Sequence, residues 1–264
     1  MIALSNAIVA DGGVPWIIGL ESGAASGWPG TDWIEDILLR SAGPDTYDQW
    51  VNHDIPWTHP AVNKAFEYFG QIALNPAYTL GGPTGVLTTN FGDAPSALFS
   101  TPTHAYMHRQ ATFIQGFIQR QNPQLRAGID YDVFPFPPID PESRGNAPVL
   151  VAGDVVNCFN HRPEVIQFAA FLISEAAQEI WVTELGELSS NKNTSPSLYI
   201  NPIIKKAWHI LLNAPISRYD GSDMMPRAVG TGTFWSGVLD YVSGVPLDAV
   251  LENIENSAVE AYSD

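Results

Sequence analysis

A polar, glycine-containing stretch followed by helically spaced apolar residues marks the carboxyl-terminal part of the chain. Residues 218–233 are rich in turn-forming side chains, so we expect irregular backbone there. Thr231 or Thr233 is suited to the N-cap of a following helix. Gly244 is suited to the left-handed position that ends it. The apolar positions of this predicted helix are spaced by three and four residues: Phe234, Trp235, Val238, Leu239 and Val242.

Trp235 in the first turn of this helix has two interpretations. Its flat ring could lie at the mouth of a cleft, where it suits the C–H face of a sugar and the helix N-terminus supplies amide donors. Alternatively, Phe234 and Trp235 both belong to the core, as aromatic residues at helical spacing commonly do. Spacing alone leaves both interpretations open.

The spacing of apolar residues predicts further elements along the rest of the chain. We expect Gly12–Gly13 to stop the first helix, and Thr31 or Asp32 to cap the second. The prolines at 135, 137, 138 and 141 favour extended backbone and indicate a crossing between two lobes. The expected helices are 2–10, from about 31, 60–72, 93–99, 163 to about 181, 203–211 and 247–258. The expected strands are 14–20 and 149–152, the latter continuing through 155–156.

Composition narrows the possible partners. The formal net charge of -16 argues against nucleic acid and against an anionic membrane surface. Only 15% of residues are charged, whereas Gly, Pro and Trp are plentiful, which suits a neutral polar ligand. Cys158 is the single cysteine, so an internal disulfide is excluded. No apolar run reaches the ~18 residues of a membrane span, and no signal peptide opens the sequence.

Three separated motifs carry a family resemblance: GWPGTDW at 27–33, a Gly-Asp pair at 153–154, and SDMMP, AVGTGTFW and YVSG in that order within 222–244. Together they resemble the extracellular solute-binding proteins of family 1, which deliver carbohydrates to ABC importers and include maltose- and α-glucoside-binding receptors. The resemblance implies that the aromatic ring at Trp235 stacks on a bound sugar. It also implies an α/β fold of the periplasmic-binding-protein type (type II).

The resemblance and the local chemistry give seven candidate ligand-binding residues. Structural alternatives stay open for four of them: a solvated loop end for Glu21, a helix cap for Asp32, an Asx turn for Asp154 and an ion pair for Arg109. The candidates are Trp28, Trp235, Asp154, Tyr106, Glu21, Asp32 and Arg109.

Two histidines raise the question of a metal site. His104 and His108 are four residues apart, which on a helix would place both on one face. Pro102 and the lack of a third matched ligand argue against that site. We expect neither a metal nor a cofactor.

The resemblance also predicts the domain organisation. Residues 1–140 and 197–264 would form a helix-rich C-terminal lobe, and 141–196 a hinge crossing with a partial N-terminal lobe. The chain opens inside an element, so we expect a fragment that lacks most of the N-terminal lobe and any signal or lipid anchor. Apolar surface near 149–156 and 168–172 should then be exposed.

The predicted function is a non-catalytic, oligosaccharide- or α-glucoside-binding component of an ABC transporter. It would act in the periplasm or outside the cell, anchored through the absent segment, with a sugar and the permease subunits as partners and no direct membrane insertion. One alternative is a glycoside hydrolase, which needs two carboxylates about 5 Å or about 6.5–9.5 Å apart; no such spacing is recognisable. The other alternative is an inert structural fragment. The sequence does not identify the sugar.

Overall fold

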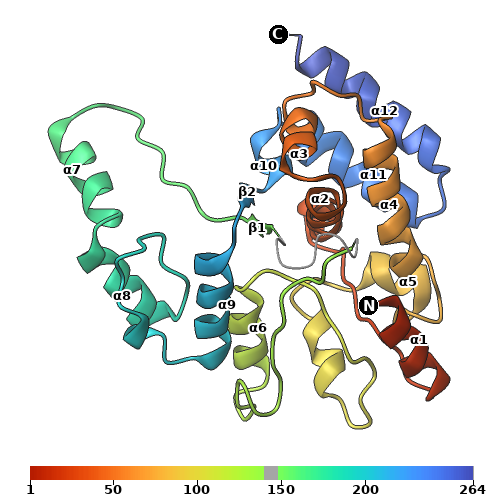
Figure 1. Cartoon of the computed structure of the whole chain (residues 1–264), viewed down its shortest axis with the longest axis horizontal. Coiled ribbons are helices and arrows are strands. Elements are labelled where there is room, and N and C mark those ends of the chain that lie inside the picture. Colours follow the sequence, from red (N-terminus) through yellow and green to blue (C-terminus); the bar gives the residue numbers. More distant parts are fainter. Residues whose placement is uncertain (140–147, 264) are drawn as a thin grey trace. The chain divides into compact units, whose positions relative to one another are not determined.

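The computed structural model describes residues 1–139 and 148–263 (Figure 1). Its contacts divide the chain into two compact units, each of which is described by itself. Unit 1 comprises residues 1–110, 137–151 and 215–264, and unit 2 comprises residues 111–136 and 152–214. The predicted lobe boundaries at 140 and 196 stay a prediction, because compactness does not identify the lobes of a receptor. Pro141, part of the predicted crossing, lies outside the described residues.

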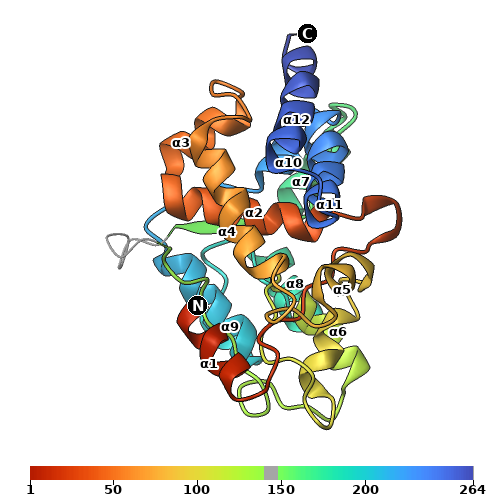
Figure 2. The ribbon, with the colours of Figure 1, turned by 90° about the vertical axis from the view of Figure 1, so that its right-hand side faces the viewer.

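Unit 1 is built around one central helix, α2 (Trp28–Ala42), whose residues from Pro29 to Arg40 are all buried. Helix α4 (Pro60–Ala73) crosses it in Figure 2 and buries the apolar face predicted from its sequence, from Val62 to Ile72. The other elements of unit 1 are α1 (Ile2–Ala10), the 3₁₀ turns η1 (Gly23–Ala25) and η2 (Ala94–Phe99), α3 (Pro44–Val51), α5 (Gly82–Thr88), β1 (Val149–Val151), β2 (Ser217–Tyr219), α10 (Gly221–Met224), the π-helical turn η5 (Val229–Phe234), α11 (Trp235–Val242) and α12 (Leu247–Ala261).

Large aromatic side chains fill the interior of unit 1. Trp50 and Trp57 lie edge to face, with ring centroids 5.0 Å apart, and both contact Phe234. Burying rings of this size contributes strongly to the stability of a core. The largest buried aromatic side chains are Trp16, Trp33, Tyr47, Trp50, Trp57, Phe66, Phe69 and Phe234.

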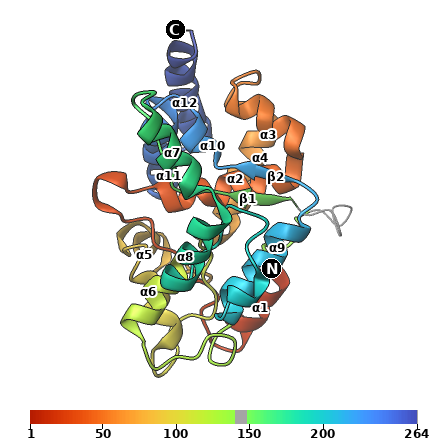
Figure 3. The same cartoon turned by 90° about the vertical axis from the view of Figure 1, so that its left-hand side faces the viewer.

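Strands β1 and β2 form a two-stranded parallel sheet, visible beside α2 in Figure 3. Val149 is paired with Ser217 and Val151 with Tyr219, so two segments distant in sequence run side by side. The backbone N–H of Asp220 donates to the carbonyl oxygen of Val151 at 2.8 Å. This bond fixes the point at which the chain leaves β2 and enters α10.

Several element predictions are confirmed, and four are corrected. Helix α1 ends before Gly12, which has a φ of +83°, as expected. Residues 15–20 are buried and Val14 is half-buried, but 14–20 are not a strand, because they meet loop segments through single bridges, as Trp16 does with Thr79 and Met107. Helix α2 begins at Trp28, ahead of the predicted Thr31, because Gly27 adopts a φ of +107° and occupies the N-cap.

The other two corrections concern residues 152–185. The predicted helix from 163 to 181 is two helices, α7 (Pro163–Leu172) and α8 (Glu175–Leu185). Ser174 breaks the run because its hydroxyl accepts the N–H of Ala177 and so begins a new helix. Val155–Val156 do not extend β1, which ends at Val151.

Unit 2 contains α6 (Ile114–Gln121), α7, α8, a 3₁₀ turn (Pro196–Leu198) and α9 (Pro202–Asn213). Its small core gathers Val182, Tyr199 and Ile204. Much apolar surface is left outside that core, as the sequence predicted for 155–156 and for most of 168–172. The exposed apolar residues near α7 and α8 include Val155, Val156, Phe159, Ile166, Phe168, Phe171, Ile173 and Ile180.

Among the described residues, no single helix is long and apolar enough to cross a membrane. Helices α7 and α8 would meet the length and composition only as a pair, and they are bent by 56° at their junction.

Candidate functional site

The segment from Asp220 to Trp235 forms a chain of short turns that leads into α11. The carboxylate of Asp220 accepts the N–H of Asp223 at 3.2 Å and the hydroxyl of Ser222 at 2.9 Å, which begins α10. This is the local side-chain-to-backbone bonding predicted for the polar stretch. After α10 the backbone enters η5, where the N–H of Thr233 donates to the carbonyl of Ala228.

The predicted N-cap of α11 is wrong. Thr231 and Thr233 lie inside η5, and their hydroxyls donate to the carbonyls of Arg227 and Ala228 at 3.3 Å. Because η5 continues directly into α11, the first N–H groups of α11 have helical carbonyls to bond, and no capping side chain is needed.

Phe234 and Trp235 have different environments. The core interpretation applies to Phe234, and the interpretation as a partly exposed ring applies to Trp235. Phe234 has 0% of its surface exposed and lies against Trp57, with ring centroids 4.8 Å apart. Trp235 is half-buried: its Nε1 atom is buried without a hydrogen-bond partner among the described residues. Phe234 therefore belongs to the core, and Trp235 keeps part of its ring at the surface.

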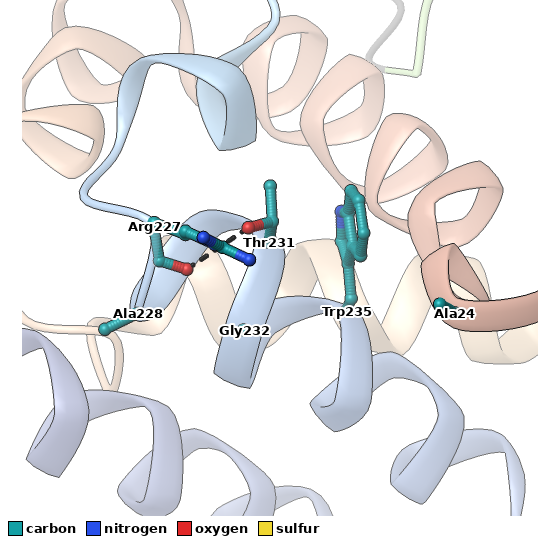
Figure 4. A pocket seen from close by; sticks show the side chains of 6 residues that line it. All are labelled: Ala24, Arg227, Ala228, Thr231, Gly232 and Trp235. Atoms are coloured by element: carbon teal, nitrogen blue, oxygen red, sulfur yellow. Dashed lines mark hydrogen bonds between the residues drawn. The ribbon is translucent and has the colours of Figure 1, made fainter.

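Trp235 lines a hollow of about 640 Å³ in unit 1 (Figure 4). Figure 4 shows its ring standing between Ala24 on one side and Thr231 on the other, with the side chain of Arg227 reaching past Thr231. A flat aromatic ring beside a hydroxyl oxygen and guanidinium donors can hold a ligand with one apolar face and a polar edge. The lining residues are Ala24, Arg227, Ala228, Thr231, Gly232 and Trp235.

The loop that carries Trp28 packs directly against the start of α11. A β-carbon at Gly27 would overlap the carbonyl oxygen of Trp235, so only glycine permits this approach. Trp28 itself is half-buried and lies edge to face with Phe91, at 5.1 Å between centroids. It is not among the residues that line the hollow. The structure therefore brings the two predicted tryptophans onto adjoining segments, with Trp235 at the hollow.

Glu21 holds the other end of that loop. Its carboxylate accepts the N–H of Gly23 at 2.6 Å and the side-chain amide of Asn90 at 2.7 Å. These hydrogen bonds lower the pKa of Glu21 below its usual value, and the bond from Asn90 has the larger effect. Glu21 is therefore an ionised loop clamp in this structure, and a direct role in ligand binding stays a prediction.

Asp32 and Arg109 lie together in the interior of unit 1. A guanidinium nitrogen of Arg109 is 3.4 Å from the carboxylate of Asp32, and a second is 3.2 Å from that of Asp36. Burial raises the pKa of Asp32 to about 8, with Arg109 opposing the shift and Asp220 adding to it. Arg109 therefore forms the structural ion pair considered as its alternative role. Asp32 is not the N-cap of α2, because it lies inside that helix.

Glu35 was not anticipated. It has no exposed surface, and its carboxylate accepts the backbone N–H groups of Gly221 at 3.0 Å and Ser222 at 3.1 Å. Burial raises its pKa well above the usual value, and these two hydrogen bonds oppose the shift. Glu35 thus joins α2 to the first residues of α10 and positions the segment that ends at Trp235. A carboxylate inside an otherwise apolar helix face was the available signal, although a solvated face gives a similar pattern.

The remaining candidates lie elsewhere. Tyr106 is 56% exposed and contacts Gly13 rather than the hollow. Asp154 is exposed and belongs to unit 2. His104 and His108 do not share a helix, and Nδ1 of the half-buried His108 lies 2.9 Å from the carbonyl oxygen of Ile17. Burial lowers the pKa of His108 to about 4. Within the described residues, no group of three or more His, Cys, Asp or Glu side chains could hold a metal ion.

Two curated proteins are similar to nearly the whole chain. The osmoprotective compounds-binding protein GgtB of Synechocystis sp. is 46% identical over 260 residues, covering 97% of this chain and 60% of GgtB. The alpha-glucosides-binding periplasmic protein AglE of Rhizobium meliloti is 43% identical over 243 residues, covering 92% of this chain and 52% of AglE. The chain thus spans between half and two thirds of the length of these relatives. No protein-family model matches.

Two solved structures share the fold at low sequence identity. A chitin oligosaccharide binding protein superposes with a TM-score of 0.77 at 17% identity, over 100% of this chain and 64% of that chain. The bacterial solute receptor AcbH, described with a preference for b-D-galactopyranose, superposes with a TM-score of 0.72 at 19% identity, over 99% of this chain and 64% of that chain.

Proposed function

We propose that this chain, which belongs to the extracellular solute-binding proteins, forms the part of a carbohydrate receptor that stacks a sugar ring on Trp235. Its fold is of the periplasmic-binding-protein type, helix-rich with a small parallel sheet, as the sequence predicted. The names of both relatives describe binding proteins, one for osmoprotective compounds and one for alpha-glucosides. We therefore propose a neutral glycoside as the ligand.

The observation that carries this proposal is the difference in burial between the neighbouring residues Phe234 and Trp235. Phe234 fills the core, whereas the neighbouring Trp235 keeps a partly exposed ring against a hollow of about 640 Å³. A partly exposed ring with its N–H edge buried presents its face, and the face is the part that packs on the C–H groups of a sugar. The buried clamp from Glu35 to Gly221 and Ser222 supports the site by fixing the preceding turn.

We further propose that the receptor acts outside the cytoplasmic membrane and passes its ligand to the permease subunits of an ABC importer. The relatives' names support the first part, since AglE is described as periplasmic. The acidic net charge of -16 disfavours an anionic membrane surface as a direct partner.

A glycosidase needs a carboxylic acid and a second carboxylate free to act on the sugar. Glu21 is occupied by Gly23 and Asn90, and Asp32 is buried beside Arg109. None of the described residues that line the hollow at Trp235 carries a carboxylate. Binding without turnover is therefore the function we propose.

Ligand-observed NMR with maltose tests the proposal, because this method detects binding even at millimolar affinity. We expect the chain to bind maltose and Trp235→Ala to lower the affinity at least about tenfold, since stacking and the lost apolar contact together exceed about 1.4 kcal/mol. Trp181→Ala, which removes another exposed tryptophan, is the matched control and should bind as the wild type does. Equal affinity in Trp235→Ala and Trp181→Ala would contradict the site, and release of nitrophenol from an aryl α-glucoside would contradict the non-catalytic function.

A further inference from the structure

The side chain of Arg227 has no protein partner among the described residues, although the chain is rich in acidic side chains. The sequence has 28 Asp and Glu residues against 12 Lys and Arg, so carboxylates outnumber cations more than twofold. Six of the seven arginines in the described part of the chain contact a carboxylate or an aromatic ring, while Arg227 makes no ion pair, side-chain hydrogen bond or ring contact there. The six partnered arginines are Arg40, Arg109, Arg120, Arg126, Arg162 and Arg218.

The backbone of Arg227 is fixed even though its side chain is free. The N–H of Val229 donates to the carbonyl of Pro226 at 2.8 Å, and the hydroxyl of Thr231 donates to the carbonyl of Arg227 at 3.3 Å. Arg227 therefore stands at a defined point ahead of η5. Its side chain is exposed and lines the same hollow as Trp235 (Figure 4). Of the described residues that line the hollow, Arg227 alone is charged.

We infer that Arg227 is a specificity-determining residue that donates paired hydrogen bonds to adjacent oxygen atoms of a neutral sugar whose ring lies on Trp235. The inference rests on the proposed function and adds the polar half of the site to it. A guanidinium presents several N–H donors in a planar fork, which matches two neighbouring hydroxyl oxygens. A protein carboxylate in contact would occupy that fork, so an unpartnered arginine leaves it open to a ligand.

The charge of the chain favours a neutral ligand over an anionic one. An anion approaching this surface meets the field of a molecule with a net charge of -16, which slows its association. One exposed guanidinium does not reverse that field. Hydroxyl oxygens are not repelled, and they still accept strong hydrogen bonds from a charged donor.

Maltose affinities of three Arg227 variants test the inference. We expect Arg227→Ala and Arg227→Gln to weaken maltose binding about tenfold or more, the factor for one hydrogen bond of about 1.5 kcal/mol from a charged donor. Arg227→Lys should not restore full affinity, because it keeps the charge and loses the planar fork. Arg162→Gln is the matched control, since it removes the same charge at an exposed arginine of unit 2. Wild-type affinity for maltose should change less than twofold between 50 and 500 mM NaCl, on the order expected when no ionic contact forms.

The outcomes distinguish the role inferred for Arg227 from the stacking site proposed at Trp235. If Arg227→Gln binds maltose as tightly as the wild type while Trp235→Ala has lost affinity, Arg227 is a solvated side chain and the stacking site survives. If methyl α-glucuronide binds more tightly than maltose and only its affinity falls in Arg227→Gln, the ligand class is anionic and our inference is wrong. A wild-type chain that binds neither sugar overturns both proposals.

Discussion

Gly27 and Trp235 meet so closely that a β-carbon on the glycine would overlap the carbonyl oxygen of the tryptophan. The two residues are distant in sequence, and each begins a helix: Gly27 is the N-cap of α2, and Trp235 is the first residue of α11. The contact places the loop from Glu21 to Gly27 beside the hollow, where Ala24 forms part of the lining. The position of the Trp235 ring thus depends on a glycine that is far away in the sequence but in contact with it in the fold.

Gly27→Ala should destabilise the chain by more than about 2 kcal/mol. The substitution adds the strain of a side chain at a φ of +107°, about 1–2 kcal/mol, to an overlap with backbone that cannot move aside. Gly12→Ala is the control, because Gly12 has a φ of +83° with nothing within 4 Å of an added β-carbon. Urea denaturation of both variants measures the difference. Similar losses in the two variants would show that the approach to Trp235 relaxes without cost.

Phe234→Ala and Trp235→Ala should separate folding from binding at neighbouring positions. Phe234 lies among Trp50, Trp57 and Phe66, so its truncation leaves a cavity and should cost about 3–5 kcal/mol. Trp235 is half-buried, so its truncation should cost less than half as much and still abolish most maltose binding. Urea denaturation and ligand-observed NMR on the same samples give both quantities. A larger stability loss for Trp235→Ala would assign that ring to the core.

Part of this structure could be predicted because it depends on local pattern. The apolar face of α4 was visible in spacing, and every position predicted for it is buried. The pair Phe234–Trp235 could not be resolved in the same way, since both residues fit one helical stripe. What separates them is η5, whose wider turn bonds Thr233 to Ala228 and changes which side chain faces the core.

The parts that could not be predicted depend on contacts between distant segments. Residues 14–20 have the composition of a strand, but a strand needs a partner strand, and loops occupy both flanks here. Glu35 accepts hydrogen bonds from residues 186 and 187 positions away. Asp32 was expected as a helix cap or a ligand contact, and the earlier start of α2 at Trp28 places it inside the helix, facing Arg109.

Glu35→Ala should destabilise the chain by about 2–5 kcal/mol, because the N–H groups of Gly221 and Ser222 would lose their acceptor in a buried site. Glu35→Gln is the conservative control, since one amide oxygen can still accept one of these bonds. We expect the glutamine variant to lose less stability than the alanine variant in urea denaturation. The reverse order would indicate that the cost of burying the Glu35 carboxyl group exceeds the value of its hydrogen bonds.

The exposed apolar surface near α7 should make the chain self-associate at high concentration. Val155, Phe159 and Phe168 are all largely exposed, with Phe159 at 95%, and a high density of exposed apolar side chains favours association. Sedimentation velocity should show an average mass that rises with concentration. Phe168→Ser combined with Phe171→Ser should reduce that rise without loss of stability, whereas Val259→Ser, on the exposed side of α12, should not. A strictly monomeric wild type at high concentration would contradict the prediction.

Asp32 should make the stability of the chain fall as the pH rises. The unfolded chain releases this proton near the ordinary value of 3.8, whereas the folded chain holds it up to about 8. Between these values the folded state binds the extra proton, so the free energy of unfolding should decrease with pH by up to about 1.4 kcal/mol per pH unit from this group. Above pH 8 this contribution should level off. Glu35, whose pKa is also raised, acts in the same direction.

Asp32→Asn removes the titrating group and keeps its size. Between pH 5 and 8 the free energy of unfolding of this variant should therefore decline less steeply, by about 1.4 kcal/mol per pH unit. Urea denaturation at unit pH intervals measures this, and Asp11→Asn, at an exposed carboxylate, is the control that should leave the slope unchanged. The groups that face Asp32 are Arg109 from the 107–110 segment, Asp36 on its own helix and Asp220 at the start of α10. An unchanged slope in Asp32→Asn would mean that Arg109 holds Asp32 ionised throughout this range, because only an ionised Asp32 would release no proton there. The ion pair with Arg109 would then outweigh the burial of the carboxylate.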